Sequence, residues 1–219
     1  GYAEKDPTAD VEGHDACRKV CILASLAFGK HVYPNQVETE GITNISLEDV
    51  SYIENAGGVI KLLGQIKYIN DNEIAAFVSP AVVYNGSQLA SVKDVFNAIL
   101  VRGDAVGDVC FYGPGAGKLP TASAVVADII DCAKHSERKK IFGWGAGAED
   151  YVVDYKEKIE RPFYVRAKAT PAEINAKFSD VKFLSRKGQP SDEVAFITDI
   201  MTENKLNKKL DGINVINTI

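Results

Sequence analysis

The stretch that decides the fold is residues 14–29, HDACRKVCILASLAFG, in which apolar side chains recur at the spacing of an α-helix. Positions 16, 20, 23, 24 and 27 are apolar, and Gly29 follows as a residue that commonly ends helices. No charged residue occurs from Val20 to Phe28, so this half of the helix is expected to be buried on every side. The sequence therefore predicts a core helix whose charged first turns emerge at a surface.

Outside this helix, the first two thirds of the chain predict short strands mixed with helices. Helices are expected at 46–55 and 119–134, and strands at 59–69, 73–84 and 108–112. Ser46 is expected to cap its helix, with Asp49 at the third position, and Pro80 to split a strand or confine it to a sheet edge. The fold class predicted is α+β, with a mixed β-sheet covered by helices on one face.

The last third of the chain shows an order of strands and helices that differs from that of the first two thirds. Its pattern predicts strand 163–169, helix 171–178, strands 181–186 and 194–200, helix 202–210 and strand 213–219. This order indicates a small ferredoxin-like βαββαβ domain over residues 160–219, following a linker at residues 143–160.

Composition excludes several classes of partner and site. The 219 residues carry a formal net charge of -5, which gives no general attraction to nucleic acid or to an anionic membrane surface. The chain contains no apolar run long enough to span a bilayer, and its four cysteines lack metal-ligand spacing, so neither a membrane segment nor a metal site is expected. Without a disulfide pattern, the expected location is a reducing cytoplasm.

The chemically informative segment is residues 6–19, DPTADVEGHDACRK, which leads into the core helix. Asp15 and Lys19 are four residues apart and so share one face of the helix. The positive helix N-terminus disfavours an ammonium there, whereas Asp15 favours it, and such opposed influences suit a lysine that transfers protons. Without those opposed influences, an acidic segment of this kind is more typical of a capped helix with a surface ion pair.

The spaced pattern D-P-x-x-D-V-x-G-x-D-x-x-x-K, from Asp6 to Lys19, resembles the signature of homoserine dehydrogenases. The resemblance implies interconversion of L-homoserine and L-aspartate 4-semialdehyde with a nicotinamide cofactor. It further implies that Lys19 exchanges a proton with the substrate oxygen and that Asp15 orients the substrate or Lys19. It also implies that Glu4 and Asp10 hold the substrate ammonium and that Tyr2 is a further substrate-binding residue.

A second segment, GPGAG at residues 113–117, joins a strand to a helix. Its spacing excludes a Walker phosphate loop, and as a bare pattern it is typical of a tight loop. Beside the first motif, it resembles the family segment that returns to the cofactor domain, which implies cofactor contacts at Gly113, Gly115, Ala116 and Gly117. The following helix would then pack on that domain, leaving apolar side chains of residues 124, 125 and 129 exposed in this chain. Residues 143–148, GWGAGA, fit a dinucleotide fingerprint but lack its flanking strand and helix.

The resemblance also implies a division into domains. Residues 1–150 would form the catalytic, substrate-binding and dimerisation domain, with residues 113–131 returning to the cofactor domain, and residues 160–219 an ACT-like regulatory domain. The Rossmann domain that binds NADP or NAD would lie outside the chain. Homodimerisation and an amino-acid effector are implied partners, although residues 168–173, KATPAE, depart from the usual effector-binding pattern. Two alternatives remain open: a non-catalytic dimerisation and regulatory module, or part of an enzyme fused to aspartate kinase.

Overall fold

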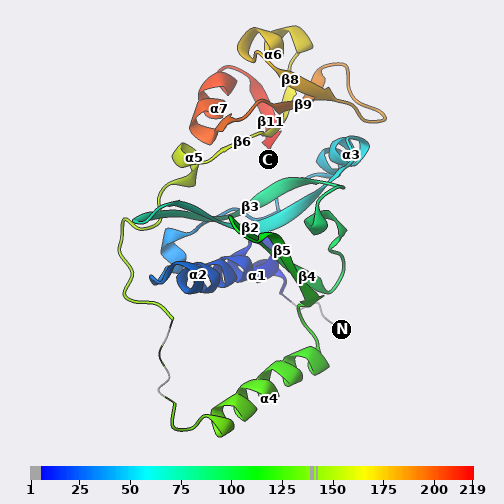
Figure 1. Ribbon diagram of the computed structural model, residues 1–219. Coiled ribbons are helices and arrows are strands. Elements are labelled where there is room, and N and C mark those ends of the chain that lie inside the picture. The colour runs from blue at the N-terminus through cyan, green and yellow to red at the C-terminus, as the bar shows by residue number, and fades with distance from the viewer. Residues whose placement is uncertain (1–5, 139–140, 142) are drawn as a thin grey trace. The chain divides into compact units, whose positions relative to one another are not determined.

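The computed structural model in Figure 1 describes residues 6–138, 141 and 143–219. The chain divides into two compact units. The sheet unit consists of residues 8–84 and 143–219. The hairpin unit consists of the segment between residues 85 and 142 together with the N-terminal end of the chain.

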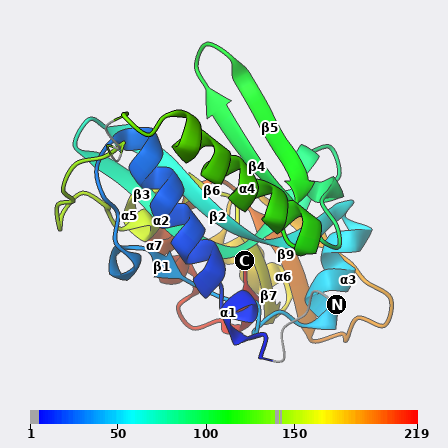
Figure 2. The same ribbon diagram turned by 90° about the horizontal axis from the view of Figure 1, so that it is seen from below.

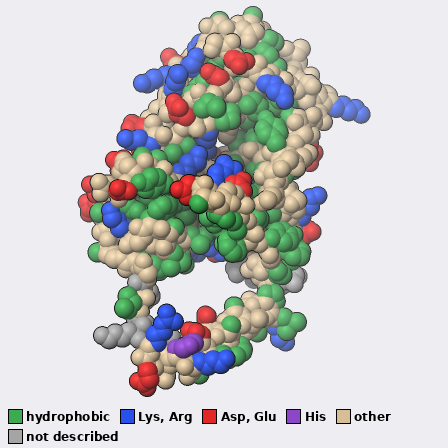
Figure 3. Space-filling view, viewed as in Figure 1, with side chains coloured by type: hydrophobic (Ala, Val, Ile, Leu, Met, Phe, Trp, Pro, Cys, Tyr) green, Lys and Arg blue, Asp and Glu red, His purple; other side chains and the backbone are tan. Residues whose placement is uncertain are grey.

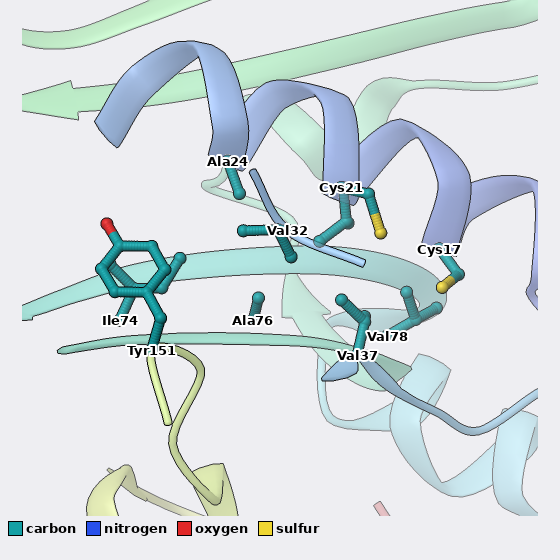
Figure 4. Packing of buried hydrophobic residues seen from close by; sticks show 10 residues of the cluster. Cys17, Cys21, Ala24, Val32, Val37, Ile74, Ala76, Val78 and Tyr151 are labelled. Carbon is teal, nitrogen blue, oxygen red and sulfur yellow. The ribbon is translucent and has the colours of Figure 1, made fainter. Parts of the chain in front are cut away.

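The predicted core helix is present as α2, His14–Phe28, in the sheet unit. It follows Gly13 and ends at Gly29, both in the left-handed conformation that favours glycine. Its buried side chains, Cys17, Cys21 and Ala24 among them, pack on β3 (Figure 4). The expectation of all-round burial is wrong, because Ile22 and Leu26 are each 54% exposed on the face away from the sheet.

A three-stranded mixed sheet supports α2, with strand order β1-β3-β2. Strand β2, Gly58–Asn70, pairs antiparallel with β3, Glu73–Tyr84, and β1, Glu38–Thr39, pairs parallel with β3. Seen from below in Figure 2, α2 crosses these strands. The helix approaches closely at Gly64, where an added Cβ would lie 2.4 Å from Cγ2 of Val20.

Pro80 neither divides β3 nor confines it to an edge, contrary to the prediction. It pairs with Leu62 of β2, and β3 is the central strand. The opposite neighbour, β1, pairs only with Phe77 and Val78, so this side of β3 has no β1 partner at Pro80. The missing proline N–H therefore costs no ladder hydrogen bond to β1.

Helices cover both faces of the sheet, which corrects the prediction of one covered face. Residues 74, 76 and 78 of β3 pack with α2, whereas Ala75 and Phe77 on the other face pack against Tyr155 and Ile159. Helix α5, Tyr155–Lys158, thus belongs to the core, and the segment expected to be a linker is instead packed against the sheet. The reason is the continuous apolar run of β3, which leaves no polar face for solvent.

The C-terminal part of the sheet unit follows the expected order of elements. Its bounds are β7 Tyr164–Lys168, α6 Pro171–Lys177, β8 Val181–Leu184, β9 Glu193–Thr198, α7 Glu203–Leu210 and β11 Asn214–Thr218. The strands form an antiparallel sheet of order β11-β7-β9-β8. Helices α6 and α7 cover one of its faces, and α3, Leu47–Asn55, packs on the other (Figure 1). A short pair, β6 Glu160–Arg161 with β10 Met201–Thr202, was not foreseen.

The hairpin unit contains an antiparallel hairpin followed by one helix. Its elements are β4 Phe96–Gly103, β5 Gly107–Pro114 and α4 Lys118–Lys134. Helix α4 has no buried residue, and Val125 and Ile129 are 53% and 61% exposed, which confirms the expected exposed apolar face. Apolar side chains lie among charged ones on the surface drawn in Figure 3. The remaining short helices are α1 Thr8–Val11 and the 3-10 turns Pro34–Gln36 and Gln88–Ser91.

Candidate functional site

The first two turns of α2 bring Asp15 and Lys19 together. The Lys19 Nζ lies 2.5 Å from Asp15 Oδ2, and the side chains are 58% and 43% exposed. The pair forms because an i, i+4 spacing stacks the two side chains on one helix face. It therefore presents an ammonium and a carboxylate to solvent, beside a helix whose other face is in the core.

Asp10 lies on α1, immediately before the turn into α2, and is exposed. The turn closes through hydrogen bonds from Gly13 N–H to the Asp10 carbonyl (3.2 Å) and from Cys17 N–H to the Gly13 carbonyl (2.9 Å). Gly13 has φ 79°, and an added Cβ would lie 3.1 Å from Thr39 and 3.2 Å from Val78. Residues 8–13 are called the substrate loop below. Glycine is required at its end by both conformation and packing.

The neighbouring residues Gly41 and Ile42 support the substrate loop through backbone contacts. The Ile42 N–H donates to the Val11 carbonyl (2.9 Å). At Gly41, an added Cβ would lie 2.3 Å from the Val11 oxygen and 2.6 Å from the Cα of Glu12, so the two backbones are in direct contact. Sequence reasoning missed this support, because Gly41 and Ile42 belong to no recognisable motif.

The other predicted site residues belong to different parts of the chain. Tyr2 and Glu4 lie outside the described residues. Residues 113–117 of the cofactor segment belong to the hairpin unit, whereas Asp10, Asp15 and Lys19 belong to the sheet unit. Of the predicted site residues, Asp15 and Lys19 are therefore paired in the sheet unit, whereas the glycine segment belongs to the hairpin unit.

Within the glycine segment, the backbone conformation explains why glycines are present. The Gly115 N–H donates to the Val95 carbonyl (2.9 Å), and an added Cβ there would lie 1.7 Å from Asn97 Nδ2. Gly117 has φ 123° and precedes α4 without a side-chain cap. Space around Gly113 is open, since an added Cβ would meet nothing within 4 Å. The segment therefore offers bare backbone at the start of a helix.

A cluster of charged residues borders β1 on the side of α5 and α7. Lys156 pairs with Glu38 and lies 3.8 Å from Glu203, while Arg161 lies 3.3 Å from Glu203. Burial, followed by the charge of Glu203, raises the pKa of Glu40. The cluster connects β1 to the first turn of α7.

A buried polar network joins α3 to the C-terminal sheet. Asp49 is fully buried and accepts hydrogen bonds from Tyr164 Oη (2.9 Å) and Asn217 Nδ2 (2.8 Å), and Arg166 Nε lies 3.1 Å from it. The predicted capping box of Ser46 is present and uses the same carboxylate. Burial and then the charge of Asp49 raise the pKa of Tyr164. The sequence predicted the cap, but gave no sign that Asp49 would also bind residues more than 100 positions away.

At the other end of α3, a second buried pair continues this junction. Tyr52 Oη donates to Glu193 Oε1 (2.8 Å), and Arg186 lies 3.0 Å from the same carboxylate. Burial, followed by the hydrogen bond to Glu193, raises the pKa of Tyr52 to about 12. One ion pair, Asp49 with Arg166, and one hydrogen bond, from Tyr52 to Glu193, therefore hold α3 against the C-terminal sheet.

The described residues contain neither a candidate metal site nor a candidate membrane-spanning helix. No group of three or more histidine, cysteine, aspartate or glutamate side chains in this part of the chain has an arrangement that could hold a metal ion. None of the helices that the described residues form combines the length and apolarity needed to span a bilayer.

Comparison with known proteins gives one family throughout. Residues 1–130 match the family profile described as homoserine dehydrogenase. The chain is 37% identical to the homoserine dehydrogenase of Lactococcus lactis over 97% of its length, and 33% identical to that of Neisseria gonorrhoeae over its whole length. The crystal structure of the homoserine dehydrogenase from Thiobacillus denitrificans matches 99% of the chain with a TM-score of 0.77 and 32% identity. A structure of the S. aureus enzyme matches 99% with a TM-score of 0.76 and 32% identity.

The matched proteins are dehydrogenases, and so oxidoreductases, and the chain shares their mixed α and β structure. The chain belongs to the homoserine dehydrogenase family. It covers 47% and 54% of the two curated relatives and 54% of the Thiobacillus chain, and so spans about half the length of these relatives.

Proposed function

We propose that this chain supplies the substrate-binding and proton-transferring part of a homoserine dehydrogenase, which interconverts L-homoserine and L-aspartate 4-semialdehyde. The observation that carries the proposal is the Asp15–Lys19 pair, exposed at the start of a helix whose opposite face is buried. An exposed ammonium on a rigid element can reach a bound substrate without rearrangement of the core.

In this proposal Lys19 handles the proton of the reacting oxygen. During oxidation of homoserine, the Lys19 amine accepts the hydroxyl proton as the carbonyl forms. In the reverse direction, the ammonium returns a proton to the developing alkoxide. Asp15, whose Oδ2 lies 2.5 Å from Nζ, holds the Lys19 side chain in place.

The substrate ammonium requires anionic partners, and the substrate loop offers them. Asp10 is exposed on α1 and is proposed to bind this group. Glu4 and Tyr2, which precede the described residues, are proposed to be the other substrate-binding residues. A positively charged amino group would then be held on one side while the reacting oxygen faces Lys19.

The nicotinamide cofactor, NADP or NAD, would accept or supply the hydride when bound. Its contacts in this chain are proposed at Gly113, Gly115, Ala116 and Gly117, because the open backbone at Gly113 and the uncapped start of α4 can accommodate a ligand closely. Most of the cofactor site is proposed to lie in a Rossmann domain outside these residues, against which the exposed face of α4 would pack.

The C-terminal βαββαβ part is proposed to be an ACT-like domain. Its strand order, β11-β7-β9-β8, supports the ferredoxin-like class. The turn before α6 has its polar groups occupied internally, since both Thr170 N–H and Thr170 Oγ1 donate to Glu173 Oε2. An effector there would have to compete with this capping box, so we favour a structural role over effector binding.

Homodimerisation is proposed to involve the hairpin of β4 and β5. An isolated two-stranded hairpin is marginally stable in water, and this one exposes Val101, Phe111 and Tyr112 by 46%, 61% and 57%. A second copy would cover this apolar surface.

An assay of the complete enzyme tests the proposed activity. Addition of L-homoserine with NADP or NAD should produce reduced nicotinamide, measured by absorbance, whereas L-serine, one methylene shorter, should give little product. Failure of homoserine to reduce either cofactor would contradict the proposal and favour a non-catalytic dimerisation and regulatory module.

A further inference from the structure

Asn217 on β11 connects the C-terminal sheet to the support of the substrate loop. We propose that Asn217 is a positioning residue for this loop, acting through the turn at residues 42–45. The inference rests on the proposed function for its kinetic consequence. The contacts that link Asn217 to the substrate loop all lie within the sheet unit.

A β-bulge places the Asn217 side chain on the face that meets α3. In the register of β11 with β7, Val215 pairs with Ala167 and Asn217 pairs with Arg166, so Ile216 is the extra residue. Val215 and Ala167 pack on the helix-covered face, and Arg166 reaches Asp49 on the opposite face. Without the bulge, the alternation of side chains would turn Asn217 toward the helices, so the bulge directs its amide to α3.

The nitrogen and the oxygen of the Asn217 side-chain amide both form hydrogen bonds. Its Nδ2 donates to the Asn44 carbonyl (3.0 Å) and to Asp49 Oδ2 (2.8 Å), while its Oδ1 accepts from Thr218 N–H (2.9 Å). An amide nitrogen has two hydrogens, and both have acceptors here. Asn217 therefore ties the turn before α3 to the buried carboxylate at the first turn of that helix.

The turn at residues 42–45 carries this restraint to the substrate loop. Its closing hydrogen bond runs from Ile45 N–H to the Ile42 carbonyl (3.0 Å), and the Ile42 N–H donates to the Val11 carbonyl (2.9 Å). Gly41, the preceding residue, is in backbone contact with Val11 and Glu12. Only one hydrogen-bonded turn thus separates Asn44 from the loop that presents Asp10.

The consequence is that the C-terminal sheet helps to set the position of the substrate-binding carboxylate. Loss of the Asn217 bond to Asn44 should loosen the turn and, with it, the bond from Ile42 to Val11. Binding of homoserine should weaken because Asp10 is no longer held in one position, whereas cofactor binding should be unaffected.

Hydrogen exchange on this chain tests the structural part. In Asn217→Ala, the Ile42 amide should exchange about five- to tenfold faster than in the unchanged chain, the range expected for one lost hydrogen bond. Asn55→Ala is the matched control, since Asn55 Nδ2 also donates to a backbone carbonyl, that of Ser185 directly after β8 (3.1 Å), but from the far end of α3. It should leave Ile42 exchange within about twofold.

Tyr164→Phe separates the two bonds of Asn217. It removes one donor to Asp49 and leaves the bond to Asn44 intact. If Tyr164→Phe speeds Ile42 exchange as much as Asn217→Ala does, the effect is a general loosening of the buried network and the proposal is overturned. Asn217→Ser, which retains a small polar side chain, gives the same comparison should Asn217→Ala fold poorly.

Kinetics of the complete enzyme test the functional part. Asn217→Ala should raise the KM for L-homoserine about fivefold with little change in kcat or in the KM for the cofactor, a coupling of ordinary size. Both control variants should retain the KM of the unchanged enzyme. An unchanged KM in Asn217→Ala, with the parent enzyme active, would refute the positioning role. An inactive parent enzyme would refute the proposed function instead, while the exchange measurement would still decide the contact.

Discussion

Replacement of Asp49 by Asn should strongly destabilise the sheet unit. The carboxylate is 0% exposed and lies between Arg166, which is 8% exposed, and four hydrogen-bond donors, namely the N–H and Oγ of Ser46, Tyr164 Oη and Asn217 Nδ2. An asparagine of the same size would retain some of these bonds but remove the negative charge. The Arg166 guanidinium would then be left buried without its ionic partner.

The magnitude follows from the cost of an unpaired buried charge. Removing one partner of a buried ion pair costs about 3–5 kcal/mol in the free energy of unfolding. For a chain of this size, each kcal/mol corresponds to a fall of about 2–4 °C in Tm, so Asp49→Asn should lower Tm by about 6–20 °C. The partly exposed Glu48, 3.8 Å from Arg166, would offset a fraction of this loss.

Thermal unfolding followed by Trp144 fluorescence measures the effect, because this tryptophan belongs to the sheet unit. Asp192→Asn is the control, since its pair with Lys168 is also on the C-terminal sheet but is 64% and 58% exposed. The control should change stability by no more than about 1 kcal/mol. A Tm for Asp49→Asn within about 2 °C of the parent would refute the reasoning that the network stabilises the junction.

Three other predictions concern thiols, alkaline pH and cofactor binding. Burial and the neighbouring Cys17 raise the pKa of Cys21 to about 12, so a thiol reagent at pH 8 should label the exposed Cys132 much faster, as peptide mapping would show. The pKa of Tyr52 is also raised to about 12, from an unfolded value near 10, so the folded state holds this proton more tightly. The stabilisation that Tyr52 gives the folded state is complete below pH 10 and is lost as pH rises through 12. In urea unfolding, Tyr52→Phe should therefore show a smaller fall in the free energy of unfolding between pH 9 and 11 than the parent chain. A fall equal to that of the parent would contradict this. Calorimetric titration of this chain with NADP or NAD should give weak or no binding, whereas tight stoichiometric binding would contradict a cofactor domain outside it.

Local signals predicted most of the elements because each depends on neighbouring residues. The period of residues 14–29 and Gly29 predicted α2, and the Ser46 cap with Asp49 predicted α3. The C-terminal order of strands and helices was likewise readable from alternation and turn residues. Failures occurred where burial depends on distant partners, as with Tyr151 and Tyr155, whose packing against the sheet replaced an expected linker.

The candidate site was predictable in part for the same reason. Spacing alone places Asp15 beside Lys19, because both lie on one helix. The support of the substrate loop by Gly41 and Ile42, and the reach of Asn217 to Asn44, join segments far apart in the sequence. A single residue of bulge in β11 determines the second of these contacts, and no local pattern specifies such a shift of register.

The most direct test of the central claim is the turnover of Lys19→Ala in the complete enzyme, measured as homoserine-dependent reduction of the nicotinamide cofactor. Lys168→Ala is a matched control, since its side chain has the same 58% exposure and the same kind of aspartate partner. If Lys19 transfers the substrate proton, Lys19→Ala should reduce kcat by about 100- to 10,000-fold with an unchanged circular dichroism spectrum, and Lys168→Ala should retain full activity. A kcat for Lys19→Ala close to that of the parent enzyme would contradict the account.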